Sequence, residues 1–221
     1  MDYDIIKSRH SVRSYTLQPL SADEVAMLDS QIRRYNAEGS LNMQLVVNEP
    51  NAFGRSLMAH YGKFRNVTNY IALTGPKSND TEAKLGYYGE KIVLEAQKAG
   101  LNTCWVGLSF SKKNTSIDIP DGNKLYALIA IGHGAESGAT HRIKTPQQIS
   151  DDYATAPDWF KRGVDYALLA PTALNQQKFH FQWLGDNRVK ASRGIGFFTK
   201  MDLGIACCHF ELGAGIPIDW Q

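Results

Sequence analysis

Cysteine, surplus charge and long apolar runs are all scarce in this sequence of 221 residues. It has three cysteines, Cys104, Cys207 and Cys208, an odd count with two adjacent thiols, so we expect reduced thiols that pack as small hydrophobes rather than a disulfide framework. The 24 basic residues against 22 acidic ones argue against a protein that coats nucleic acid, which needs a large basic excess. No apolar run approaches the roughly 18 residues of a membrane span, the longest covering about residues 126–131, so we expect no membrane partner.

Several catalytic signatures are also missing. The sequence has no H-E-x-x-H, C-x-x-C or G-x-S-x-G motif, which argues against zinc hydrolysis and elbow-type serine esterases. Residues 207–209 (Cys-Cys-His) could suggest a metal site, but neighbours in a helix project about 100° apart and cannot converge on one ion, so we predict no metal. The glycine pairs at 194–196 and 213–215 lack the third glycine of a dinucleotide-binding loop. The first ten residues lack the features of a secretory leader, so we expect a cytoplasmic protein.

The sequence has the composition of a globular protein, with 43% hydrophobic and 21% charged residues. Its hydrophobic periodicity predicts interleaved helices and strands without a linker between them, and therefore one intertwined α+β unit. Ser21 and Glu24 have the spacing of a capping box, with Gly39 as the expected stop of that helix. Further helices are expected over residues 79–99, 159–170, 172–177 and 202–212, and strands over 43–47, 70–74, 103–106, 125–131 and 179–183.

One segment recurs along the chain. Residues 89–105 and 204–220 both carry Gly, then Ala-Gly ten residues later, and Trp five residues after that last Gly. Such self-similarity can change the interpretation of a whole fold. We interpret it as a duplication, in which residues 1–150 form one half and residues 151–221 a shorter second half that packs as a partner subunit would.

Three clusters of residues could bind a ligand. Arg9, His10, Ser11 and Arg13 combine two guanidiniums, an imidazole and a hydroxyl, which suits a phosphate group, and Arg142 and Lys144 could assist them. The alternative is a solvated basic turn. Residues 171–179 offer a capping hydroxyl and amides that both donate and accept, which suits a flat heterocycle, although a capped surface helix would look the same. Residues 100–108 end a strand at glycine, where backbone N–H groups can approach a ring, but they could equally form a core strand.

Taken together and in this order, the clusters resemble the FMN-dependent nitroreductase family. Residues 9–13 are similar to its phosphate motif R-[RH]-S-x-[RK], residues 100–107 to G-L-x-x-x-W-x-G, and residues 171–177 to P-[ST]-x-x-N-x-Q. The resemblance implies an α+β nitroreductase-like fold, with antiparallel or mixed central sheets flanked by helices and two pseudo-symmetric halves that mimic the family homodimer. The chain departs from the pattern in two ways: the third motif lies about 160 residues after the first instead of soon after it, and Lys178-Phe179 replaces the family's Pro-Trp. We therefore expect the second half to supply this motif in cis, with one flavin per chain.

The resemblance also implies roles. Arg9, Ser11, Arg13 and Arg142, with Lys144 in the same loop, would hold the FMN phosphate, and His10 would lie near the ribityl chain. The segment with Pro171, Thr172, Ala173, Asn175 and Gln177 would contact the pyrimidine edge of the ring, and the backbone of Trp105, Val106, Gly107 and Leu108 would lie along the ring. No catalytic side chain is required, because the flavin carries the chemistry. NADH or NADPH would reduce FMN, and a small nitroaromatic or quinone-like acceptor would then take the hydride in a ping-pong cycle.

Some alternatives stay open. The chain could be an FMN-binding carrier or sensor without turnover, or an enzyme of this fold with other redox chemistry, such as dehalogenation or flavin breakdown. A pseudo-dimer could act as a monomer or form a homodimer. Tyr61, Lys63 and Arg65 could face the acceptor, or could belong to a solvated loop before the strand at residue 70.

Overall fold

The computed structural model describes residues 3–53 and 63–218, which form two compact units assembled from interleaved segments. One unit comprises Met1–Ser8, Glu82–Lys91 and His141–Gln221, and the other comprises Arg9–Thr81 and Ile92–Thr140. We call them the hairpin unit and the sheet unit. The predicted halves, residues 1–150 and 151–221, stay a prediction. Among the described residues, no helix has both the length and the apolar character that crossing a membrane would require.

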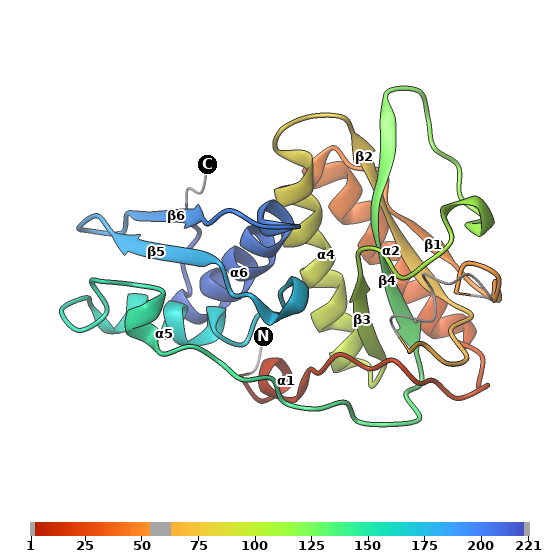
Figure 1. Cartoon of the computed structure of the whole chain (residues 1–221), viewed down its shortest axis with the longest axis horizontal. Coiled ribbons are helices and arrows are strands. Elements are labelled where there is room, and N and C mark those ends of the chain that lie inside the picture. The colour runs from red at the N-terminus through yellow and green to blue at the C-terminus, as the bar shows by residue number, and fades with distance from the viewer. Residues whose placement is uncertain (1–2, 54–62, 219–221) are drawn as a thin grey trace. The chain divides into compact units, whose positions relative to one another are not determined.

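The sheet unit is built on a four-stranded antiparallel sheet with the order β1-β2-β4-β3 (Figure 1). Its strands are β1 (Gln44–Val46), β2 (Tyr70–Pro76), β3 (Asn102–Val106) and β4 (Asn123–Gly132). The two central strands, β2 and β4, are almost entirely buried, which explains why both read as continuous apolar runs. The strand β3 lies at one edge of the sheet, a position that matters for the site below.

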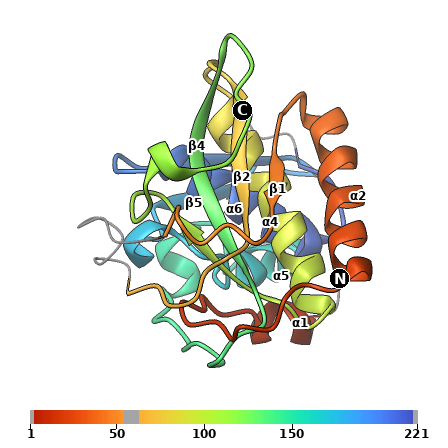
Figure 2. The same ribbon diagram turned by 90° about the vertical axis from the view of Figure 1, so that its right-hand side faces the viewer.

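Helix α2 (Ala22–Gly39) lies beside β1 in the sheet unit (Figure 2). The predicted capping box is confirmed: the Glu24 N–H donates to Ser21 Oγ at 3.2 Å, and the Ser21 N–H donates to Glu24 Oε2 at 2.7 Å. The predicted stop at Gly39 is wrong by one residue. Gly39 is still helical, and Ser40 takes the left-handed conformation (φ 53°) in which its N–H closes the last turn on the Asn36 carbonyl.

The hairpin unit consists of a two-stranded sheet and helices. Strands β5 (Phe179–Trp183) and β6 (Val189–Arg193) form an antiparallel hairpin, and helices α5 (Asp158–Ala167) and α6 (Thr199–Ala214) pack closely together (Figure 1). The unit also contains α1 (Tyr3–Ser8) and the Glu82–Lys91 part of helix α4 (Thr81–Lys98). Phe181 stacks on Phe210 with ring centroids 4.5 Å apart, and Phe160 meets Phe210 edge-on at 5.3 Å. These rings join β5, α5 and α6 in one apolar core.

Helices α4 and α6 touch backbone to backbone within the hairpin unit. A Cβ added at Gly204 would lie 1.9 Å from the Ala83 carbonyl oxygen, and one added at Gly86 would lie 2.1 Å from the Met201 carbonyl oxygen. Only glycine permits such an approach. In the predicted repeat, Gly100 and Gly215 are equivalent, and both follow a helix with positive φ (82° and 73°). The last two residues of the second copy, 219 and 220, lie outside the described residues.

The predicted strands and long helices are found close to their expected ranges, but two predictions fail. Residues 172–177 are not helical: only a single 3₁₀ turn, Ala173–Asn175, forms there, because Leu174, Asn175 and Gln177 have positive φ. The predicted helix over 159–170 begins one residue earlier and ends at Ala167. Strand β6 has no counterpart among the predicted elements.

Candidate functional site

The arginine cluster (Arg9, His10, Ser11 and Arg13) lies along β3, the edge strand of the sheet unit. Ser11 forms a parallel bridge with Thr103 of β3, and the Val12 N–H donates to the Thr103 carbonyl at 3.0 Å. Arg13, two residues after Ser11, is also held through its backbone, because its carbonyl accepts from the Arg65 N–H at 2.9 Å. The predicted phosphate motif is therefore held in place by the sheet, and the structure brings it together with the β3 motif that contains Trp105.

Cys104 of β3 follows Thr103, the residue with which this cluster pairs. Burial raises the pKa of the Cys104 thiol, whereas Arg13, a hydrogen bond with Ser11, and Arg9 lower it. Arg9 is 3% exposed and Arg13 is exposed, so one guanidinium is fixed inside the protein while the other reaches solvent. Two permanent cations and a hydroxyl in one place form a donor set that fits a phosphate monoester.

His10 and a glycine that the sequence did not suggest complete the cluster. Burial and the charge of Arg9 both lower the pKa of His10, which favours its neutral ring. Gly138 crosses the cluster with φ 71°, and a Cβ there would lie 2.8 Å from His10 Cβ and 3.0 Å from the Ser11 carbonyl oxygen. The signal available in the sequence was a glycine in the loop that follows a strand, a position that often needs a close backbone approach.

The predicted motif at residues 100–108 runs through β3 and continues past its end. Val106 is the last residue of the strand and is buried, Trp105 and Gly107 are half-buried, and Leu108 is exposed. Arg65, which we considered for the acceptor side, pairs through its backbone with Ser14 and so lies beside Arg13. Lys63 is exposed. Tyr61 lies outside the described residues.

The loop of residues 172–177 belongs to the hairpin unit and is strained. Leu174, Asn175 and Gln177 all have left-handed φ values between 45° and 53°, which non-glycine residues rarely adopt. Such conformations cost about 1–3 kcal/mol each, and they persist only where the surroundings hold them; they cluster at functional sites.

Neighbouring residues hold this loop through its amide side chains. Asn175 Nδ2 and Gln177 Nε2 each donate to the Arg142 carbonyl at 2.8 Å, and Gln177 Oε1 accepts from the Lys144 N–H at 2.9 Å. The Lys144 ammonium donates to the Gln177 carbonyl at 2.7 Å. The structure thus brings Arg142, Lys144, Asn175 and Gln177 together and bonds the two amides, the Lys144 ammonium and the Arg142 carbonyl to one another. Thr172 Oγ1 accepts from the Gln177 N–H at 3.0 Å, and its own hydrogen can still be donated.

A buried carboxylate that was not among the predicted site residues also accepts hydrogen bonds from this loop. Asp202, in the first turn of α6, accepts from the Ala173 N–H at 3.0 Å and from Gln176 Nε2 at 2.7 Å. Burial raises its pKa to about 6, an effect that the two donors partly oppose. The signal in the sequence was an acidic residue inside an otherwise largely apolar helix.

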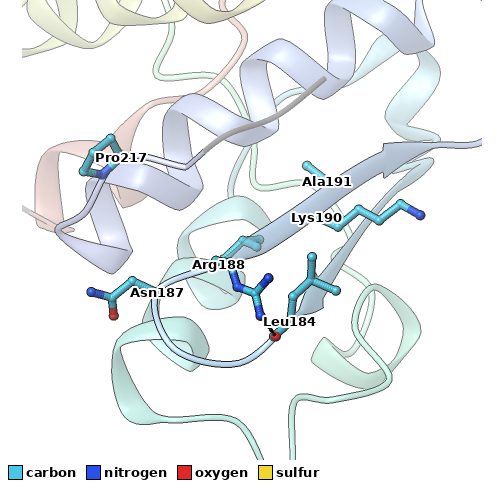
Figure 3. A pocket seen from close by; sticks show the side chains of 7 residues that line it. Leu184, Asn187, Arg188, Lys190, Ala191 and Pro217 are labelled. Atoms are coloured by element: carbon cyan, nitrogen blue, oxygen red, sulfur yellow. Dashed lines mark hydrogen bonds between the residues drawn. The ribbon is translucent and has the colours of Figure 1, made fainter.

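A separate cavity of about 490 Å³ opens at the turn of the β5–β6 hairpin (Figure 3). Leu184, Asn187, Arg188, Lys190, Ala191 and Pro217 lie around it, and Arg188 donates to the Leu184 carbonyl at 3.1 Å. None of the predicted site residues lines this cavity.

Comparison with known proteins places these features in context. The model of the family described as "Putative TM nitroreductase" matches residues 3–214. A "putative nitroreductase" from Thermotoga maritima is similar over 95% of this chain and 82% of its own, with a TM-score of 0.68 and 21% identity. Two further structures each cover 66% of this chain at 18% identity: a "putative nitroreductase in complex with FMN" from Desulfovibrio desulfuricans (92% of its own chain, TM-score 0.52) and a "putative NADH dehydrogenase/NAD(P)H nitroreductase" from Bacteroides thetaiotaomicron (94%, TM-score 0.51). These likenesses confirm the predicted α+β fold. No curated protein matches the chain.

Proposed function

Because the chain belongs to the family described as "Putative TM nitroreductase", we propose that it is a flavin oxidoreductase that binds FMN and uses NADH or NADPH to reduce a small nitroaromatic or quinone-like acceptor. The pairing of Ser11 and Val12 with Thr103, which places Arg9, Ser11 and Arg13 along the edge strand β3, carries this proposal. Bound FMN would supply the hydride transfer, so the chain needs no nucleophile or acid of its own.

At the phosphate end, the buried Arg9 and the exposed Arg13 would provide two charged donors, and the Ser11 hydroxyl a neutral one. Guanidinium groups suit this task because they stay charged and can bind two phosphate oxygens at once. Arg142, in the hairpin unit, is exposed and stays a predicted phosphate ligand. A neutral His10 ring can both donate and accept, which suits a contact with the ribityl hydroxyls.

At the ring end, the hydroxyl of Thr172 and the backbone at Pro171 and Ala173 would contact the pyrimidine edge of FMN. Asn175 and Gln177 would then act mainly by shaping the loop, since their amides are already bonded to Arg142 and Lys144. The backbone from Trp105 to Leu108 would lie along the ring. This arrangement uses residues 151–221 in the role of a partner subunit and predicts one flavin per chain.

The proposal is tested by titrating the purified protein with FMN and then mixing the complex with NADH and with NADPH without oxygen. We expect a yellow protein with one FMN per chain, whose flavin absorbance bleaches with at least one of the two donors. Protein that binds no FMN would refute the proposal. Binding without bleaching would refute the oxidoreductase and favour the carrier or sensor.

A further inference from the structure

Helix α6 contains a buried carboxylate, Asp202, at a position where ionisation is unfavourable. Most of its residues are buried, and Asp202 in its first turn is 3% exposed. Placing an ionised carboxylate away from water is unfavourable unless it does something that a neutral residue could not. Burial, the largest cause of its raised pKa, is not offset by a cation among its hydrogen-bond partners, because both are neutral amides.

The two oxygens of Asp202 reach both sides of the strained turn. Oδ1 accepts from the Ala173 N–H, and Oδ2 accepts from the side chain of Gln176. Between these two residues lie Leu174 and Asn175, both left-handed, with φ values of 53° and 52°. A carboxylate can accept on both oxygens at once, whereas an asparagine side chain offers one acceptor and one donor. As a carboxylate, Asp202 can therefore accept both hydrogen bonds from the turn, whereas an asparagine in its place could accept only one.

Two basic side chains of the hairpin unit donate to acceptors other than Asp202. The Lys178 ammonium donates to the Ile195 carbonyl at 2.8 Å, and Arg193 donates to Thr199 Oγ1 at 3.1 Å. The part of α4 that packs against this turn of α6 places Gly86 beside the Met201 carbonyl. Both hydrogen bonds described for Asp202 run to the 172–177 loop.

We propose that Asp202 is a positioning residue, which clamps residues 173–176 in the left-handed turn that receives the flavin ring. This inference rests on the function proposed above. It has a specific consequence: removing the charge should loosen the loop and weaken FMN binding without destabilising the rest of the protein. A merely structural residue would instead lower global stability and FMN binding together.

The test compares Asp202→Asn, Asp202→Ala and a control, Glu90→Gln, in the full chain. Glu90 is a buried acid on α4 whose carboxylate lies 2.9 Å from His209 Nε2 of α6. We expect FMN to bind about tenfold more weakly to Asp202→Asn, from the loss of one hydrogen bond, and more weakly still to Asp202→Ala. Amide exchange in the apo protein should rise at residues 172–178 and stay slow in α6. The melting temperature of apo Asp202→Asn at pH 7 should not fall, and Glu90→Gln should keep the FMN affinity of the wild type.

Each other result overturns the inference. If the wild type binds FMN and Asp202→Asn binds it equally well, Asp202 does not position the loop, although the proposed function stands. If Asp202→Asn loses FMN affinity together with melting temperature, and exchange rises throughout the hairpin unit, its role is structural only. If the wild type itself binds no FMN, the proposed function fails and this inference fails with it.

Discussion

Truncation of Arg13 is the sharpest test of the phosphate end. Arg13 is exposed and its backbone is fixed to Arg65, so Arg13→Ala should fold normally. A hydrogen bond to a charged group contributes about 1.5–3 kcal/mol, which corresponds to a loss of FMN affinity of about ten- to hundredfold. Riboflavin carries the same ring without the phosphate, so its affinity should be the same for Arg13→Ala and the wild type. Quenching of flavin fluorescence measures both affinities.

Two matched variants complete this experiment. Arg13→Lys keeps the charge but loses the planar fork, so its FMN affinity should fall between those of wild type and Arg13→Ala. Arg34→Ala removes an exposed arginine that pairs with Glu38 on α2, and it should change nothing. Equal losses for FMN and riboflavin in Arg13→Ala, or no loss at all, would refute the assignment of Arg13 to the phosphate.

Three further predictions concern glycines and a titration. Gly138→Ala should weaken FMN binding and destabilise the fold by about 1–3 kcal/mol, because φ is 71° and the new Cβ would clash with His10 and Ser11. Melting curves and FMN titration measure the two effects, and wild-type values for both would contradict the prediction. The folded pKa of Asp202, about 6, exceeds the ordinary value of 3.8, so the folded state holds its proton more tightly and stability should fall as pH rises from 4 to 6, by up to about 3 kcal/mol. Urea unfolding of the wild type and Asp202→Asn across this range should show the difference, and parallel profiles would disprove it. Gly204→Ala should cost about 3 kcal/mol or more because of its contact with the Ala83 carbonyl, whereas Gly194→Ala, with ordinary contacts only, should cost little; similar urea midpoints for the two would refute the packing argument.

Local patterns predicted those parts of the fold that local interactions determine. The capping box of Ser21 and Glu24 acts within one turn, and the apolar run of β4 follows from burial on both faces, so both were visible in the sequence. Strand β6 was missed because three of its five residues are exposed and polar: Lys190, Ser192 and Arg193.

The loop at 172–177 shows why the rest could not be predicted. Thr-Ala-Leu-Asn-Gln-Gln is compatible with a helix by local propensity, which is what we expected. Its conformation is instead imposed by groups distant in sequence, among them the Arg142 carbonyl, Lys144 and the carboxylate of Asp202. The family motif identified the loop as a candidate site, but only the tertiary hydrogen bonds assign its shape.

The central claim is that the chain binds FMN and that the arginine cluster holds its phosphate. A crystal structure of the chain with FMN tests this directly. We predict one FMN per chain, with its phosphate on Arg9, Ser11 and Arg13. A flavin whose phosphate lies elsewhere would contradict the claim.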